Sequence, residues 1–137
     1  MASSNNMTVR LEWDGDFRFV GSVDERAIAV DGDAAAAASP VQMLATGLAG
    51  CMAIDVAHIL AKMRTPADAL TADLAVQRAA DDPRRVISAK MHVTVFGDVP
   101  DNNVQRALDM SRETYCSVWH SLRQDIEFAT DFEVRPA

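Results

Sequence analysis

The stretch from Ser39 to Met63, SPVQMLATGLAGCMAIDVAHILAKM, decides the fold. Ser39 is a preferred helix N-cap and Pro40 a preferred first helical residue. From Met43 onward apolar residues occupy nearly every face, so the helix is expected to be buried on most sides. A chain of 137 residues offers few other elements to cover such a helix. The pattern therefore favours an obligate homodimer in which each subunit covers the helix of the other.

The segments on both sides of this helix show the alternation of apolar and polar residues that is typical of strands. An Ala-rich linker over residues 34–38 separates the first strands from the helix, and Asp101 is expected to cap a further helix. The order predicts an α+β fold in a single domain over residues 1–137, with residues 1–6 disordered. Strands are expected within 7–13, 17–19, 28–30, 70–76, 87–95 and 126–134, and further helices within 101–108 and 111–122.

Charge and composition indicate which partners and which location the protein is expected to have. The formal net charge is −7 and the sequence pI is near 4.8, which argues against nucleic acid and against an anionic membrane surface as partners. The start of the chain lacks the apolar core of an export signal, and the apolar run that ends at Asp55 is too short for a membrane span. These features predict a cytoplasmic protein with no membrane partner.

The two cysteines, Cys51 and Cys116, are the residues with the clearest chemical potential. In a cytoplasmic protein they are not expected to form a permanent disulfide. Two thiols do not make the usual four-ligand zinc site, and the three histidines show no ligand spacing with them, so no metal site is expected. Taken alone, each cysteine is more simply interpreted as a small apolar core residue.

Helical spacing places Cys51, Asp55, His58 and Lys62 on one face of the long helix. Asp55 is a carboxylate in a largely apolar helix, so it needs a partner, and a partner across an interface is the simplest interpretation. A cation that favours the Cys51 thiolate has to come from elsewhere in the chain, and Arg18 and Arg26 of the N-terminal strands are the candidates.

If residues 111–122 form a continuous helix, the same spacing brings further charged residues to the side of Cys116. Glu113 is the candidate carboxylate among them. A histidine in such a position is more often a surface or hydrogen-bonded residue than a catalytic base. The residues expected on this side are Arg112, Glu113, His120 and Arg123.

Several blocks, in order along the chain, carry a family resemblance. Both cysteines lie inside such blocks. From Trp13 to Val134, nearly the whole chain, the sequence resembles the OsmC/Ohr family of organic hydroperoxide resistance and osmotically inducible proteins, and within it the OsmC-like branch. The matching blocks are Phe17–Gly21, Asp31-Gly32, Ser39–Leu44, Gly47–Val56, Asp82–Arg84, Ala107–Ser111 and Glu113–Val118.

The resemblance implies an intertwined homodimer with two central buried helices wrapped by antiparallel β-sheets. It also implies a thiol-dependent peroxidase that reduces organic hydroperoxides in oxidative-stress defence. By position Cys51 is then the peroxidatic cysteine, Cys116 the resolving cysteine and Arg18 the thiolate-stabilising cation, with Glu113, Asp55 and Gln42 around them. No bound cofactor is implied, because an external dithiol, such as one of the lipoyl type, regenerates the thiols.

The sequence departs from the family pattern ahead of the first cysteine. Val41 stands where the Ohr branch has a glutamate that holds the arginine, and Gln42 stands where the OsmC-like branch often has one. This departure keeps an alternative open, namely a non-catalytic dimer that binds a small apolar ligand or senses redox state. A third interpretation, a structural dimer with inert cysteines, applies if the two sulfurs lie too far apart to bridge.

Overall fold

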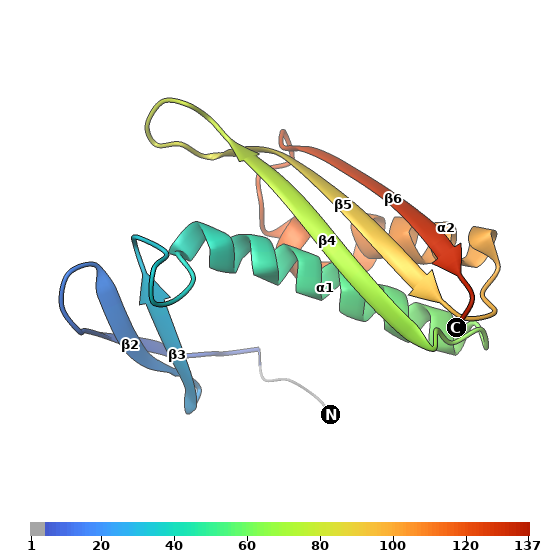
Figure 1. Ribbon diagram of the computed structural model, residues 1–137, viewed down its shortest axis with the longest axis horizontal. Coiled ribbons are helices and arrows are strands. Elements are labelled where there is room, and N and C mark those ends of the chain that lie inside the picture. The colour runs from blue at the N-terminus through green and yellow to red at the C-terminus, as the bar shows by residue number, and fades with distance from the viewer. Residues whose placement is uncertain (1–4) are drawn as a thin grey trace. The chain divides into compact units, whose positions relative to one another are not determined.

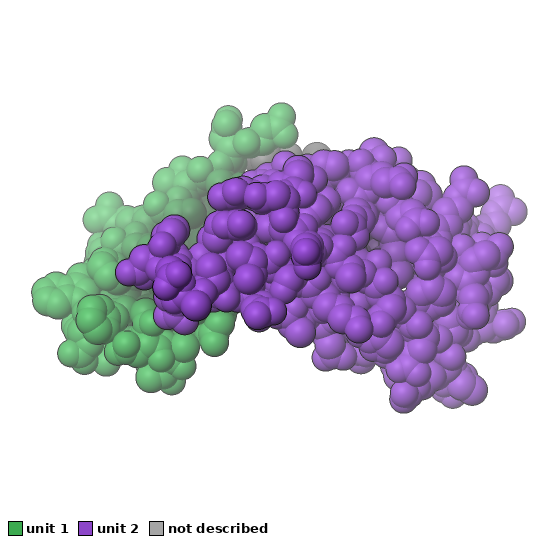
Figure 2. All heavy atoms as spheres, turned by 90° about the horizontal axis from the view of Figure 1, so that it is seen from above, with its two compact units in different colours: residues 1–44 green, residues 45–137 purple. Residues whose placement is uncertain are grey.

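The computed structural model describes residues 5–137. By its internal contacts the chain divides into two compact units, one up to Leu44 and one from Ala45 onward, which are coloured green and purple in Figure 2. Residues 1–4 of the segment expected to be disordered lie outside the described part, and Asn5 and Asn6 precede the first strand. The assignment of a single domain to residues 1–137 stays a prediction.

The first unit contains an antiparallel sheet in the order β1-β2-β3, formed by Val9–Trp13, Arg18–Val23 and Arg26–Asp31. The three predicted N-terminal strands are therefore confirmed. Gly21 is required in β2, because a Cβ atom there would lie 1.8 Å from the carbonyl oxygen of Arg10 in the neighbouring strand.

The Ala-rich segment after β3 folds back onto Asp31. The backbone N–H groups of Asp33, Ala35 and Ala36 donate to the Asp31 carboxylate at 2.9, 3.3 and 2.9 Å. These hydrogen bonds, the one from Ala36 foremost, hold the pKa of Asp31 below its usual value because they stabilise the charged carboxylate. The carboxylate thus organises the turn that leads into the long helix.

The long helix α1, Pro40–Lys62, begins and ends close to the predicted bounds. The backbone N–H of Gln42 donates to Ser39 Oγ at 3.2 Å, and the backbone N–H of Ser39 donates to Gln42 Oε1 at 3.0 Å. This reciprocal pair is a capping box, which satisfies two backbone donors that the first turn leaves free. Ser39 is thus the N-cap, as predicted.

The second unit is built on the sheet β4-β5-β6, formed by Ala69–Arg78, Val86–Phe96 and Glu127–Arg135. β4 and β5 are antiparallel, whereas β5 and β6 are parallel. The expectation of purely antiparallel sheets is therefore wrong for β6. The chain reaches β6 through helices that run beside α1 on one side of the sheet, which sets the direction of the last strand (Figure 1).

The core of the second unit lies between this sheet and the helices α1 and α2, the latter Asp101–Met110. Alternating residues of β5 face it, together with one stripe of each helix. Pro100, not Asp101, occupies the N-cap position of α2, and Asp101 is its first residue. The buried apolar residues of the core include Leu48, Met52, Val56, Leu60, Met91, Val93, Val95, Val104, Leu108, Trp119 and Phe128.

Within one chain α1 buries only a stripe of its surface, not most sides as expected. Ile54 remains 70% exposed although it is a large apolar residue. The 23-residue helix has a mean hydropathy of 1.7 over its most apolar window, so by length and composition alone it is long enough to cross a membrane. Core helices of soluble proteins pass the same test, and 28% of that window is buried within this chain.

The predicted continuous helix over residues 111–122 is wrong. Residues Ser111–Tyr115 form a π-helical turn, η1, that continues α2, and the backbone N–H of Cys116 closes it on the Ser111 carbonyl at 2.7 Å. Cys116 itself is extended, with φ −72° and ψ 97°. A short helix, α3, follows at Ser117–His120. Cys116 therefore lies at a break between helical segments, not inside a helix.

Candidate active site

Two sulfurs and a carboxylate meet at the junction of α1 with this break. The sulfurs of Cys51 and Cys116 and a carboxylate oxygen of Asp55 all lie within 4.8 Å of one another. Both cysteines are free thiols. Cys51 and Asp55 come from successive turns of α1, which confirms their predicted common face. Cys116 reaches them from a point 65 residues after Cys51 in the sequence.

The fold buries Cys116 completely and fixes its sulfur. The residue is the N-cap of α3, and its Sγ accepts a hydrogen bond from the backbone N–H of Trp119 at 3.4 Å. Burial above all, and the neighbouring Cys51 and Asp55 as well, raise the pKa of the Cys116 thiol to about 11, although the hydrogen bond from the Trp119 N–H acts in the opposite direction. At neutral pH Cys116 is therefore a protonated thiol. Cys51, by contrast, is half-buried.

A buried hydroxyl holds the carboxylate of Asp55. Ser111 Oγ donates to Asp55 Oδ2 at 2.8 Å, and the Ser111 side chain has no exposed surface. Asp55 thus finds a partner within its own chain, not across an interface as expected. The contact connects α1 to the first residue of η1, 56 positions further along the chain. No sequence pattern pointed to Ser111, because nothing in its neighbourhood marks it as a partner of a distant helix.

The Arg112 side chain contacts two aromatic rings and a backbone carbonyl. Its guanidinium carbon lies 5.5 Å from the ring centroid of Trp119 and 5.1 Å from that of Phe128, and its Nη1 donates to the Phe128 carbonyl. The two rings are themselves in contact, with centroids 4.8 Å apart. We call these three residues the arginine clamp. The clamp attaches β6 to α3, whose backbone binds the sulfur of Cys116.

The other residues expected beside Cys116 lie in less confined positions. Glu113 and His120 are exposed, and Arg123 forms an ion pair with Asp125 at 2.5 Å. Their predicted common face depended on a continuous helix over residues 111–122, which the structure does not contain. A role for Glu113 near the sulfurs stays a prediction.

Two predicted site residues belong to the first unit. Arg18 Nη1 lies 3.3 Å from Asp16 Oδ2, and its Nη2 donates to the Asp14 carbonyl at 3.3 Å. The alternative cation, Arg26, begins β3. Gln42 closes the capping box at the start of α1. The thiolate-stabilising role of Arg18 and the site role of Gln42 stay predictions.

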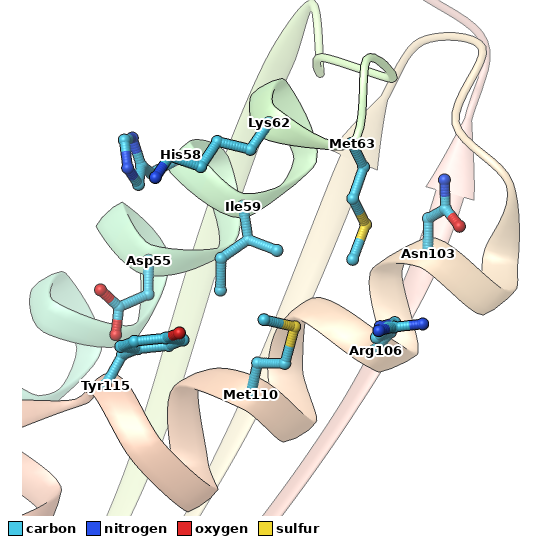
Figure 3. A pocket seen from close by; sticks show the side chains of 9 residues that line it. All are labelled: Asp55, His58, Ile59, Lys62, Met63, Asn103, Arg106, Met110 and Tyr115. Carbon is cyan, nitrogen blue, oxygen red and sulfur yellow. The ribbon is translucent and has the colours of Figure 1, made fainter.

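A cavity of about 670 Å³ opens beside Asp55. Asp55, His58 and Lys62 line it from one side of α1, and Met110 and Tyr115 line it from the side of α2 and η1 (Figure 3). The predicted common face of these α1 residues is therefore confirmed, and it borders a hollow. The remaining lining residues are Ile59, Met63, Asn103 and Arg106.

The side of the cavity formed by α2 and η1 was not predicted. Asn103, Arg106 and Met110 follow the three- and four-residue spacing of one helix face, which is the signal that could have indicated it. Asn103 is fixed by a hydrogen bond from its Nδ2 to Thr65 Oγ1 at 3.1 Å. The cavity offers apolar walls and two cationic side chains, those of Lys62 and Arg106, next to the cluster of sulfurs and carboxylate.

Comparison with known proteins places these features in a wider group. The profile of the family described as OsmC-like protein matches residues 31–131, a range that includes both cysteines. Protein YhfA of Escherichia coli K12 is 34% identical over 131 residues, which cover 93% of this chain and 98% of YhfA.

Solved structures share the fold over nearly the whole chain. One, from structural genomics, is 32% identical, covers 95% of this chain and 99% of its own, and superposes with a TM-score of 0.86. The organic hydroperoxide resistance protein OhrB of Bacillus subtilis is 14% identical, with 92% of this chain and 98% of OhrB covered and a TM-score of 0.65. At that identity the likeness to OhrB concerns the fold alone.

Proposed function

The chain belongs to the OsmC-like protein family, and from that premise we propose that it is a thiol-dependent peroxidase that reduces organic hydroperoxides in oxidative-stress defence. The observation that carries the proposal is the proximity of the two sulfurs, within 4.8 Å of each other. A disulfide requires a separation of about 2.05 Å, so the sulfurs have less than about 3 Å to move. This proximity argues against inert cysteines too far apart to bridge.

The difference in exposure between the two thiols supports the assignment of their roles. Cys51 is half-buried, whereas Cys116 is fully buried and protonated at neutral pH. Cys51 is therefore the sulfur that a peroxide can reach. Its thiolate attacks the terminal oxygen of the hydroperoxide, the O–O bond breaks, and the alkoxide leaves and takes up a proton as the alcohol. Cys51 becomes a sulfenic acid.

The second step consumes the buried thiol. The sulfur of Cys116 attacks the sulfenic sulfur of Cys51, its proton and the sulfenic hydroxyl leave as water, and the Cys51–Cys116 disulfide forms. An external dithiol, such as one of the lipoyl type, then exchanges with this disulfide. It becomes a disulfide itself and returns the protein to the dithiol state. No bound cofactor is needed for this cycle, which we place in the cytoplasm.

We further propose that the active form is a homodimer. Proteins of this family are homodimers, and α1 has an apolar surface that one chain leaves uncovered, with Ile54 70% exposed. Arg18 is proposed as the cation that favours the Cys51 thiolate. No carboxylate precedes Cys51 at positions 41 and 42, where Val41 and Gln42 stand, so that arginine lacks the partner it has in other branches of the family.

The same departure favours one alternative, a dimer that binds an apolar ligand or senses redox state without turnover. The two functions differ after the first oxidation of the thiols. A peroxidase consumes many equivalents of cumene hydroperoxide when a dithiol such as dihydrolipoamide is supplied. A sensor is oxidised once and consumes no further peroxide. Measurement of peroxide consumption against protein concentration separates the two.

The direct test is mass spectrometry of the reduced protein after treatment with cumene hydroperoxide. We expect an intramolecular Cys51–Cys116 disulfide in the wild type and a sulfenic acid at Cys51, trapped by dimedone, in the Cys116→Ser variant. The Cys51→Ser variant should lose peroxide consumption. Full consumption by Cys51→Ser would refute the assignment, and a folded wild type that forms neither product would refute the peroxidase function.

A further inference from the structure

The cluster of two sulfurs and a carboxylate contains one group, the carboxylate of Asp55, that disulfide formation does not require. A thiol pair needs only two sulfurs to form a disulfide, yet the Asp55 carboxylate lies within 4.8 Å of both. Three potential anions at one point match the requirements of a cation.

We propose that the reduced protein binds one Zn²⁺ ion per chain through Cys51 Sγ, Cys116 Sγ and the carboxylate of Asp55. Thiolate and carboxylate are both established zinc ligands, with Zn–S near 2.3 Å and Zn–O near 2.0–2.2 Å. Three protein ligands with a fourth position left to water are typical of open zinc sites. Among the residues that the structure describes, the three donor atoms are already within 4.8 Å of one another.

The surroundings of the three donors resemble the outer shell of a metal site. Ser111 Oγ donates to Asp55 Oδ2 at 2.8 Å, which orients the carboxylate, and the backbone N–H of Trp119 donates to Cys116 Sγ at 3.4 Å. Ligating carboxylates and thiolates are commonly held by such hydrogen bonds. Of the three donor residues, Asp55 also lines the neighbouring cavity.

Binding and oxidation then exclude each other. When Zn²⁺ binds, the two thiols lose their protons and both sulfurs are held by the metal. When the disulfide forms, neither sulfur remains as a thiolate ligand. Zinc therefore protects the reduced thiols from peroxide, and oxidation abolishes the site. The expectation that no metal site exists counted only cysteines and histidines as ligands, and it omitted the carboxylate on the same helix face as Cys51.

Cobalt titration of the reduced protein under argon tests this proposal. Co²⁺ is a spectroscopic substitute for Zn²⁺, and thiolate coordination gives a charge-transfer band in the near ultraviolet. We expect the band to saturate at one Co²⁺ per chain and to disappear when Zn²⁺ is added. The Zn²⁺ affinity is then measured by competition with a chromophoric chelator.

Variants locate the site. Asp55→Asn keeps the side-chain shape and removes the charge, so we expect its Zn²⁺ affinity to be weaker by roughly tenfold or more. Ser111→Ala removes the hydrogen bond that orients the carboxylate, so its Zn²⁺ affinity should be weaker by roughly 10–100-fold. Asp73→Asn makes the same change at an exposed position on β4 and should leave the affinity unchanged. Wild-type protein in its disulfide form should bind no Zn²⁺, and this control requires no substitution.

Three results would overturn the proposal: no charge-transfer band, binding that the disulfide form retains, or equal affinities of Asp55→Asn and Asp73→Asn. None of these depends on peroxide turnover. A protein that binds Zn²⁺ as described but consumes no peroxide in its reduced, metal-free form would refute the proposed peroxidase and leave the metal site intact.

Discussion

Ser111 Oγ donates a hydrogen bond to Asp55 Oδ2 at 2.8 Å, and this contact joins α1 to η1 directly beside the two cysteines. The serine side chain is fully buried. Removal of the hydroxyl in Ser111→Ala leaves a carboxylate oxygen without its donor. We expect the free energy of unfolding to fall by about 1–3 kcal/mol, as measured by urea denaturation of the reduced protein.

Ser121→Ala is the matched control for this variant. Ser121 Oγ also donates at 2.8 Å, to the Ser117 carbonyl, but it is exposed and water replaces the contact. Its expected effect is within about 0.5 kcal/mol. Equal losses in the two variants would mean that the buried contact contributes no more than an exposed one.

Alkylation of the native protein should separate the two thiols. Cys116 has no exposed surface and a pKa of about 11, so its thiolate fraction at pH 7 is on the order of 10⁻⁴. We expect iodoacetamide to label Cys51 well before Cys116, as followed by peptide mass spectrometry. Between pH 7 and pH 9 the labelling rate of Cys116 should rise roughly 100-fold.

Urea-denatured protein is the control for that experiment, because both cysteines are then exposed and should react at similar rates. If Cys51 is still labelled well before Cys116 after unfolding, the difference in labelling rate comes from local sequence and not from burial. Equal rates in the native protein would contradict the placement of Cys116 in the core.

Sequence could predict those strands and helices in which the spacing of apolar residues matches the side that is buried. β4 alternates between exposed and partly buried residues along Ala69–Val76, and the apolar pattern there predicted the strand. Ser39 and Pro40 marked the start of α1 because capping is a local interaction of neighbouring residues. In these cases the physical cause of the structure lies within a few residues of its effect.

The break at Cys116 could not be predicted in this way. Residues 111–122 contain neither glycine nor proline, so no local signal interrupts a helix there. The causes lie at a distance: Ser111 is bound to Asp55, and Arg112 is stacked on Phe128 of β6. The sequence did place the two cysteines in recognisable blocks, but it did not show that the Asp55 carboxylate lies within 4.8 Å of both sulfurs.

The arginine clamp should contribute to stability through its ring contacts. Arg112→Ala removes the guanidinium from Trp119 and Phe128 together with one hydrogen bond, so we expect a loss of about 1–3 kcal/mol in the free energy of unfolding. Arg112→Lys keeps the charge without the planar group, so its free energy of unfolding should lie between those of the wild type and Arg112→Ala. Arg123→Ala, which breaks an exposed ion pair, should lower the free energy of unfolding clearly less than Arg112→Ala does. A loss in Arg112→Ala no larger than this would contradict the clamp.

Stability should depend on pH through His92 on the outer face of the second sheet. Its ring nitrogens lie 2.6 Å from Asp131 Oδ1 and 3.1 Å from Glu133 Oε1, and these hydrogen bonds raise the pKa of His92 above 6.5. Folding therefore favours the protonated ring. The stabilisation is complete below the unfolded-state pKa and is lost as the pH rises through the folded-state pKa.

The measurement for His92 is a comparison of urea unfolding at pH 6 and pH 9. The stability difference between wild type and His92→Gln should be larger at pH 6. Ser121→Ala, at an exposed position, removes no ionisable group and is the control, whose difference from wild type should not change with pH. A difference for His92→Gln that stays constant between the two pH values would mean that the carboxylates do not favour its protonated form.

If the proposed homodimer forms through α1, self-association should be sensitive to substitution of Ile54. This side chain is 70% exposed on α1, and burial of an isoleucine contributes about 1.5–3 kcal/mol. In a two-fold dimer each substitution occurs twice, so Ile54→Asp should weaken self-association by at least roughly tenfold, as measured by analytical ultracentrifugation. Thr71→Asp, at an exposed position on β4, should leave self-association unchanged. If Ile54→Asp dimerises as tightly as the wild type, the exposed stripe of α1 is not the surface that the second chain covers.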